Sequence, residues 1–224
     1  MIITIDGPVA TGKSTIAKKV SELLGFIYID TGAMYRCLTY GILSKGISLD
    51  DSDAIKKLLE NFEFEFRLIK GERCYFVEGQ DVTLAIRSPE VTAAVSKVAA
   101  IKEVREKLVT LQRKLSKNIN AVCEGRDLGT VVFPNAELKI FLTGRDDVRA
   151  KRRLEEFKAK FPEETETMTL EEAIADVLKR DLYDSQREHS PLKKAGDAVE
   201  IDTSDLTVVQ IVEKILDLAE RRKG

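Results

Sequence analysis

Several residue types are scarce in this 224-residue chain, and each scarcity excludes a class of protein. The chain has no tryptophan, one histidine and three scattered cysteines, Cys37, Cys74 and Cys123. Cysteines at this spacing form neither a disulfide framework nor a zinc-binding pattern, so we expect small buried side chains in a reducing compartment. The single histidine, His189, lies in an expected loop without an evident partner and is given no catalytic role.

Charge of one sign and long apolar segments are also missing. The net charge is −2, so no overall basic field attracts nucleic acid. No apolar run reaches the roughly 18 residues that a membrane-spanning helix needs. The first strand is expected from residue 2, which leaves no room for a signal peptide. We therefore expect a cytoplasmic, monomeric protein that binds neither nucleic acid nor membrane.

Short apolar strands alternate with amphipathic helices along most of the chain. Strands are expected at 2–6, 26–30, 120–124, 138–142 and 198–201, and helices at 12–24, 33–45, 51–60, 146–160, 169–188 and from 207 onward. This alternation is typical of a parallel sheet that is covered by helices on both faces. The predicted fold class is therefore α/β.

The pattern changes in the middle of the chain. Residues 62–68 alternate strictly between apolar and charged side chains, and further strands are expected at 74–77 and 82–86. We interpret these segments as a small antiparallel sheet inserted into the α/β chain. Ser88 followed by Pro89 then predicts the start of one long helix that continues to Leu115.

Residues Gly7 to Ser14 read Gly-Pro-Val-Ala-Thr-Gly-Lys-Ser and follow the first strand directly. Two glycines, then lysine and a hydroxyl residue, form the pattern of a phosphate-binding loop, and an ordinary glycine turn is the weaker interpretation. The glycines let backbone N–H groups face phosphate oxygens, and the next helix adds its positive N-terminus. Lys13 is expected to reach the β- and γ-phosphates. Ser14 is expected to hold Mg²⁺, which is otherwise bound through nucleotide phosphates and water.

A phosphate loop does not by itself distinguish a switch, a motor and a small-molecule kinase. The Asn-Lys-x-Asp motif of Ras-type GTPases is absent, and arginines follow the core strands instead. These are Arg36, Arg126, and, together on one helix face, Arg180 and Arg187 with Asp184. Ligands of open α/β sheets bind at the carboxyl ends of the strands, where guanidinium groups can grip a second phosphate. The alternative for the helix is a solvated salt-bridge ladder that includes Asp176.

Four segments, residues 7–15, 30–36, 124–134 and 180–192, resemble the bacterial cytidylate kinase family. The resemblance covers nearly the whole chain and implies a P-loop nucleoside-monophosphate-kinase fold with a five-stranded parallel sheet, an antiparallel β insertion and a helical lid. One domain, 1–224, is expected, with its core at 1–60 and 98–224. The monophosphate-binding insert is expected at about 61–97 and the lid at about 155–188.

The resemblance also implies a role for each site residue. ATP is expected to contact Gly7, Pro8, Val9, Ala10, Thr11, Gly12, Lys13, Ser14, Thr15, Arg149 and Arg153. CMP is expected to contact Thr31, Arg36, Ser96, Arg105, Arg126, Asp127, Arg180, Asp184 and Arg187. Among the CMP residues, Ser96, Arg105 and Asp127 are expected to read the cytosine base. The expected catalytic residues, drawn from both sets, are Lys13, Arg126, Arg153 and Arg187. Without the resemblance, Ser96 and Arg105 read as surface residues of a long helix.

The implied reaction is phosphoryl transfer from ATP to CMP or dCMP with Mg²⁺. The carboxylate of Asp127 can accept a hydrogen bond from the exocyclic amine of cytosine, whereas uracil presents a carbonyl there. A kinase for UMP or AMP is the alternative within the same class. A nucleotide-dependent switch that binds partners is the alternative from another class.

Overall fold

The structure, a computed structural model, describes residues 1–165 and 167–223. Glu166 of the predicted lid and Gly224 at the end of the predicted domain lie outside the described residues. The chain divides into two compact units, one made of residues 1–30 and 113–224 and the other of residues 31–112. The boundaries expected for core, insert and lid stay predictions.

The first unit is built on a five-stranded sheet. Its strands are β1 (Ile2–Asp6), β2 (Ile27–Asp30), β6 (Ala121–Glu124), β7 (Leu138–Thr143) and β8 (Val199–Asp202). They run in the order β2-β6-β1-β7-β8, and every neighbouring pair is parallel. The predicted parallel sheet is confirmed, and β1 lies at its centre, so the phosphate loop leaves the sheet from its middle strand.

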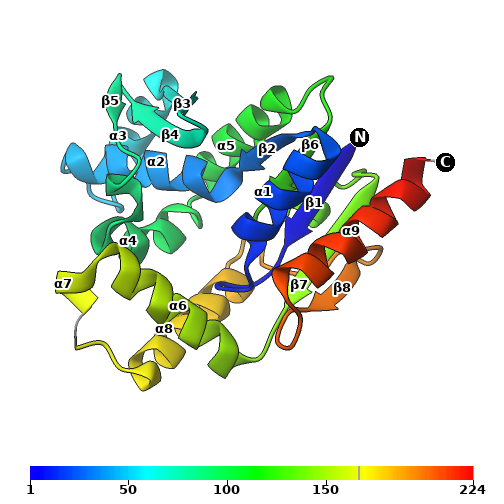
Figure 1. The fold of residues 1–224 in the computed structure, drawn as a ribbon. Helices are drawn as coiled ribbons and strands as arrows, with labels where there is room; N and C mark the ends of the chain where they lie inside the picture. The colour runs from blue at the N-terminus through cyan, green and yellow to red at the C-terminus, as the bar shows by residue number, and fades with distance from the viewer. Residues whose placement is uncertain (166, 224) are drawn as a thin grey trace. The chain divides into compact units, whose positions relative to one another are not determined.

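Helices complete the first unit. They are α1 (Lys13–Leu24), the π-helix η2 (Leu128–Val132), α6 (Asp146–Lys160), α7 (Pro162–Thr165), α8 (Leu170–Gln186) and α9 (Val208–Lys223). Helices α1 and α9 lie side by side along the sheet (Figure 1). Their side chains Ile16, Val20 and Ile215 are buried in one cluster with strand residues, and each such burial contributes about 1.5–3 kcal/mol.

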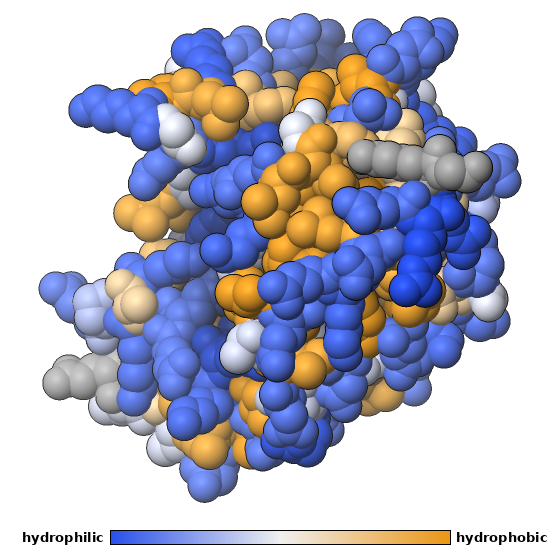
Figure 2. Space-filling view, turned by 45° about the vertical axis from the view of Figure 1, so that its right-hand side comes forward, coloured by the Kyte–Doolittle hydropathy of each residue, from blue (hydrophilic) through white to orange (hydrophobic). Residues whose placement is uncertain are grey.

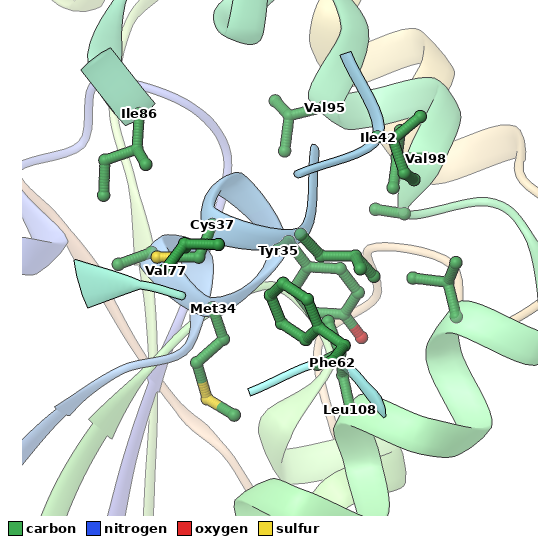
Figure 3. Packing of buried hydrophobic residues seen from close by; sticks show 14 of the residues in the cluster. Met34, Tyr35, Cys37, Ile42, Phe62, Val77, Ile86, Val95, Val98 and Leu108 are labelled. Atoms are coloured by element: carbon green, nitrogen blue, oxygen red, sulfur yellow. The ribbon is translucent and has the colours of Figure 1, made fainter. Parts of the chain in front are cut away.

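The second unit has its own core around α2. Its elements are α2 (Thr31–Ser44), α3 (Ser52–Asn61), β3 (Phe64–Ile69), β4 (Glu72–Val77), β5 (Gln80–Asp81), η1 (Ala85–Arg87), α4 (Pro89–Val98) and α5 (Lys102–Leu115), of which the last turn belongs to the first unit. Strands β3, β4 and β5 form the predicted antiparallel sheet. Figure 3 shows Met34, Tyr35 and Cys37 of α2 within the buried cluster.

Two predicted elements are wrong. Residues 82–86 are not a strand, because the Ile86 N–H donates to the Val82 carbonyl at 2.9 Å and closes a helical turn that buries both side chains. The long helix from residue 89 is interrupted between α4 and α5. There the Arg105 guanidinium donates to the carbonyl oxygen of Ala99 at 3.1 Å, just past the C-terminus of α4.

Hydrophilic residues cover much of the face shown in Figure 2, with apolar patches between them. Several large apolar side chains are exposed, with Leu68 at 71% the most exposed of them. Within residues 1–165 and 167–223, the structure has no helix whose length and apolar character suffice to cross a membrane.

Candidate active site

The phosphate loop joins β1 to α1, and its first glycine is required by the sheet. Gly7 has a φ of 146°, and a Cβ atom at this position would lie 2.2 Å from the carbonyl oxygen of Leu142 in β7. Gly12, with a φ of 87°, is the N-cap of α1, so Lys13 is the first helical residue. The loop therefore ends at a positive helix N-terminus, which suits an anionic ligand.

Lys13 is buried inside this loop. Its Nζ donates to the Pro8 carbonyl oxygen at 2.5 Å and to Thr11 Oγ1 at 3.3 Å. Burial, and then the charge of Arg126, lower the pKa of Lys13 to about 7, while nearby carboxylates such as Glu124 oppose this shift. A bound phosphate would add negative charge beside Lys13 and favour its ammonium form.

Oxygen atoms suited to Mg²⁺ meet at the start of α1. Ser14 Oγ donates to Glu124 Oε1 at 2.5 Å, and the Tyr28 hydroxyl donates to the same oxygen at 3.1 Å. Burial, and then the carboxylate of Asp30, raise the pKa of Glu124. The described residues contain no group of three or more His, Cys, Asp or Glu side chains placed to hold a metal ion. The Ser14 hydroxyl and the Glu124 carboxylate are oxygen donors of the kind that suits a magnesium ion.

Three arginine side chains of the first unit, Arg126, Arg153 and Arg180, form a cationic cluster with Lys13, in which Lys13 and Arg153 are buried and Arg126 and Arg180 are half-buried. Burial, and then Arg153 and Arg126, lower the pKa of Arg180 to about 10. Burial also lowers the pKa of Arg153. Nε and Nη2 of Arg153 and Nε of Arg180 are buried and have no hydrogen-bond acceptor among the described residues. Buried donors without acceptors cost free energy, so the cluster is built for an anion.

Two carboxylates balance part of this charge. Arg126 Nε donates to Asp184 Oδ2 at 3.1 Å, and Arg187 Nη2 donates to Asp127 Oδ1 at 3.4 Å. Asp184, Arg187 and Asp127 are all less than 10% exposed. A solvated salt-bridge ladder on one helix face therefore does not describe these residues, and Arg187 is the extended C-cap that follows the last residue of α8.

The two arginines predicted to flank ATP differ in their surroundings. Arg149 donates to four acceptors of the protein, the carbonyl oxygens of Gly144 and Val9 and the carboxylates of Asp146 and Asp181. Arg153, one turn later on α6, donates to Glu156 at 3.2 Å and stacks on the ring of Phe157. Only Arg153 combines burial with nitrogen atoms that have no partner in the described part of the chain.

The second unit carries four of the predicted CMP residues. Arg36 donates to the Ile86 carbonyl oxygen at 3.0 Å and to Thr92 Oγ1 at 2.9 Å. Arg105 is 4% exposed and lies over the ring of Tyr35, so it is not a surface residue. Thr31, the first residue of α2, is buried, and Ser96 of α4 is half-buried.

Sequence reasoning missed three side chains that support this site. Asp6 accepts from the N–H groups of Leu128 and Gly129, Tyr28 donates to Glu124, and Asp181 accepts from Val9. Each lies within two residues of a predicted motif, but only the folded chain reveals which partner it contacts.

Comparisons with known proteins agree on one family. The family model described as Cytidylate kinase matches residues 3–221. A cytidylate kinase of Protochlamydia amoebophila (strain UWE25) is 60% identical over 223 residues, which cover 100% of this chain and 98% of that protein. A cytidylate kinase of Geobacillus sp. (strain WCH70) is 49% identical over 99% of this chain and 97% of its own length.

Among solved structures, the shikimate kinase of Bacteroides thetaiotaomicron matches with a TM-score of 0.52 and 12% identity, covering 98% of both chains. At that identity the likeness concerns the fold alone, and it agrees with the predicted P-loop kinase fold. The match of the family model over nearly the whole chain, together with relatives that are 60% and 49% identical to it over almost their full length, shows that this chain belongs to the cytidylate kinase family.

Proposed function

We propose that this kinase transfers the γ-phosphoryl group of ATP to CMP and dCMP, giving ADP and the corresponding diphosphate. Membership of the cytidylate kinase family supports the substrate assignment. The observation that carries the chemistry is the cationic cluster, which has buried N–H groups without an acceptor among the described residues and belongs to the same compact unit as the phosphate loop. Such a cluster stabilises charge on a phosphoryl group in transit.

The phosphate loop and Lys13 hold the triphosphate, with further contacts from the predicted residues 7–15 and from Arg153. Ser14 and Glu124 would hold Mg²⁺, which would neutralise phosphate charge. Arg126 and Arg153 face the transferring group. Their positions are set before the reaction, because Arg126 is held by Asp184 and Arg153 by Glu156.

Each residue predicted for CMP is proposed to contact one part of the nucleotide. Arg36 and Arg126 bind its phosphate, with Arg187. Arg180 and Asp184 contact its sugar. Thr31, Ser96, Arg105 and Asp127 complete the set, with Asp127 accepting from the cytosine amine. Uracil would meet Asp127 with an acceptor, which leaves polar groups unpaired and disfavours UMP.

The transfer needs neither a phosphoenzyme nor a general base, because a phosphate monoester is already nucleophilic near neutral pH. It does require exclusion of water, which would otherwise hydrolyse ATP. We assign this role to the predicted lid, residues 155–188. We also propose that the enzyme is a monomer, that it is cytoplasmic and that it acts in pyrimidine nucleotide metabolism.

The test is an assay of ADP formation from ATP·Mg²⁺ with and without CMP, with the second product identified. We expect rapid ADP formation only with CMP or dCMP present, and one CDP or dCDP formed for each ADP. Slow ATP hydrolysis that does not depend on an acceptor would instead support a nucleotide-dependent switch.

A further inference from the structure

Asp181, a residue of α8, connects the predicted lid to the phosphate loop. Its Oδ1 accepts from the backbone N–H of Val9 at 3.0 Å, and its Oδ2 accepts from Arg149 Nη1 at 2.5 Å. Arg149 Nη1 also donates to the Val9 carbonyl oxygen at 3.0 Å, so both backbone polar groups of Val9 are bound. We propose that Asp181 is a positioning residue of the phosphoryl transfer, which acts by fixing Val9 and Arg149. This inference rests on the proposed function.

Arg149 is committed to this arrangement. Its four hydrogen bonds to the protein use four of the five N–H groups of a guanidinium. Arg149 is also 4% exposed. It therefore serves the loop, whereas Arg153 keeps buried N–H groups free for an anion.

Packing of its side chain also holds Val9 in place. The Val9 side chain is 6% exposed and lies in an apolar cluster with Ala150 of α6 and with Ala173 and Val177 of α8. Helices α6 and α8 lie side by side (Figure 1). Val9 is therefore fixed by its N–H, its carbonyl oxygen and its side chain.

The positions of Val9 and Asp181 affect two groups of the site through their chain neighbours Pro8 and Arg180. Pro8, next to Val9, supplies the carbonyl oxygen that Lys13 Nζ contacts at 2.5 Å. Arg180, next to Asp181, belongs to the cationic cluster. Asp181 thereby fixes the position of Lys13 relative to Arg180, although it does not itself contact the substrate. Because transfer rates depend on sub-ångström positioning, loss of this contact should impair ATP use.

Two substitutions at Asp181 separate its contacts. Asp181→Asn keeps an acceptor for the Val9 N–H but loses the ion pair with Arg149, and Asp181→Ala loses both. Glu213→Gln is the control, because it neutralises an exposed carboxylate of α9, in the same unit and outside the predicted lid. The measurements are steady-state kinetics for ATP and CMP, MgATP binding by calorimetry without CMP, and urea unfolding.

We expect Asp181→Ala to lower kcat/KM for ATP by roughly 10- to 100-fold and Asp181→Asn by less, as for hydrogen bonds to a charged group. The KM for CMP at saturating ATP should change less than about threefold, and the kcat/KM of Glu213→Gln for ATP should stay within about twofold of the wild-type value. If Asp181→Ala does not fold, Asp181→Asn decides. An unchanged kcat/KM for ATP in a folded Asp181 variant, or equal effects on ATP and CMP, would overturn the proposal.

A double-mutant cycle tests whether Asp181 acts through Arg149. We expect the Asp181→Ala, Arg149→Ala double variant to lose much less than the product of the single losses. Fully multiplicative losses would contradict the mechanism. A wild-type enzyme that makes no CDP would refute the proposed function, yet the comparison of MgATP binding among the variants would still test Asp181.

Discussion

At the scale of single residues, the site is defined by charges kept out of water. Lys13, Arg153 and Arg187 are each less than 10% exposed, although lysine and arginine are seldom fully buried in proteins. Burial lowers the pKa of Lys13 and Arg153, so these groups are destabilised until an anion arrives. Burial of these charges therefore lowers the stability of the protein without a ligand, while it keeps the side chains in place for an anion.

Asp6 allows a test by pH. Burial, opposed by N–H groups of Gly129 and Leu128, raises the pKa of Asp6 from 3.8 to about 6. The folded state thus holds this proton more tightly than the unfolded state does. The associated stability is present below about pH 4 and is lost as pH rises to about 6, by about 3 kcal/mol at most.

Asp6→Asn removes this titration. We expect the unfolding free energy of the wild type minus that of the variant to fall as pH rises from about 4 to 7, since other groups cancel in the difference. Urea unfolding at several pH values measures it. A difference that stays constant or increases with pH would show that Asp6 is not protonated in this way.

At the scale of elements, helices and strands with strong periodicity were predictable and the connections were not. The helix at 146–160 and the strand at 2–6 have the expected bounds. The strand predicted at 82–86 is wrong because a short apolar segment fits two structures. Val82 and Ile86 lie four residues apart, which also suits a helical turn, and the structure forms that turn. The break between α4 and α5 was missed because its stabilising contact, from Arg105 to Ala99, is not visible as a period in the sequence.

The junction of β1 with the phosphate loop yields a prediction about glycine. Gly7→Ala places a methyl group against the backbone of β7, whereas Gly12→Ala meets only Ile16 Cδ1 at 3.6 Å. We expect Gly12→Ala to cost about 1–2 kcal/mol from its left-handed backbone and Gly7→Ala clearly more. Urea unfolding of the two variants provides the comparison. Equal decreases in the free energy of unfolding would mean that the backbone of β7 moves to accommodate the added methyl group.

At the scale of the whole molecule, the fold followed from the order of strands and helices. Alternating strands and helices prescribe a parallel sheet, and an alternating apolar and charged segment prescribes the antiparallel one. The residues of the site were harder to predict from the order of strands and helices. The phosphate loop is a local pattern, but Ser96 and Arg105 became candidates only through resemblance, and the role of Asp181 needed the folded chain.

The central claim is that this kinase phosphorylates CMP in preference to other nucleoside monophosphates. The most direct measurement is the ratio of kcat/KM for CMP to that for UMP, with ATP·Mg²⁺ saturating. We predict a ratio of about 100 or more, because an acceptor facing Asp127 leaves buried polar groups unpaired. A ratio near one, or a preference for UMP, would contradict the account.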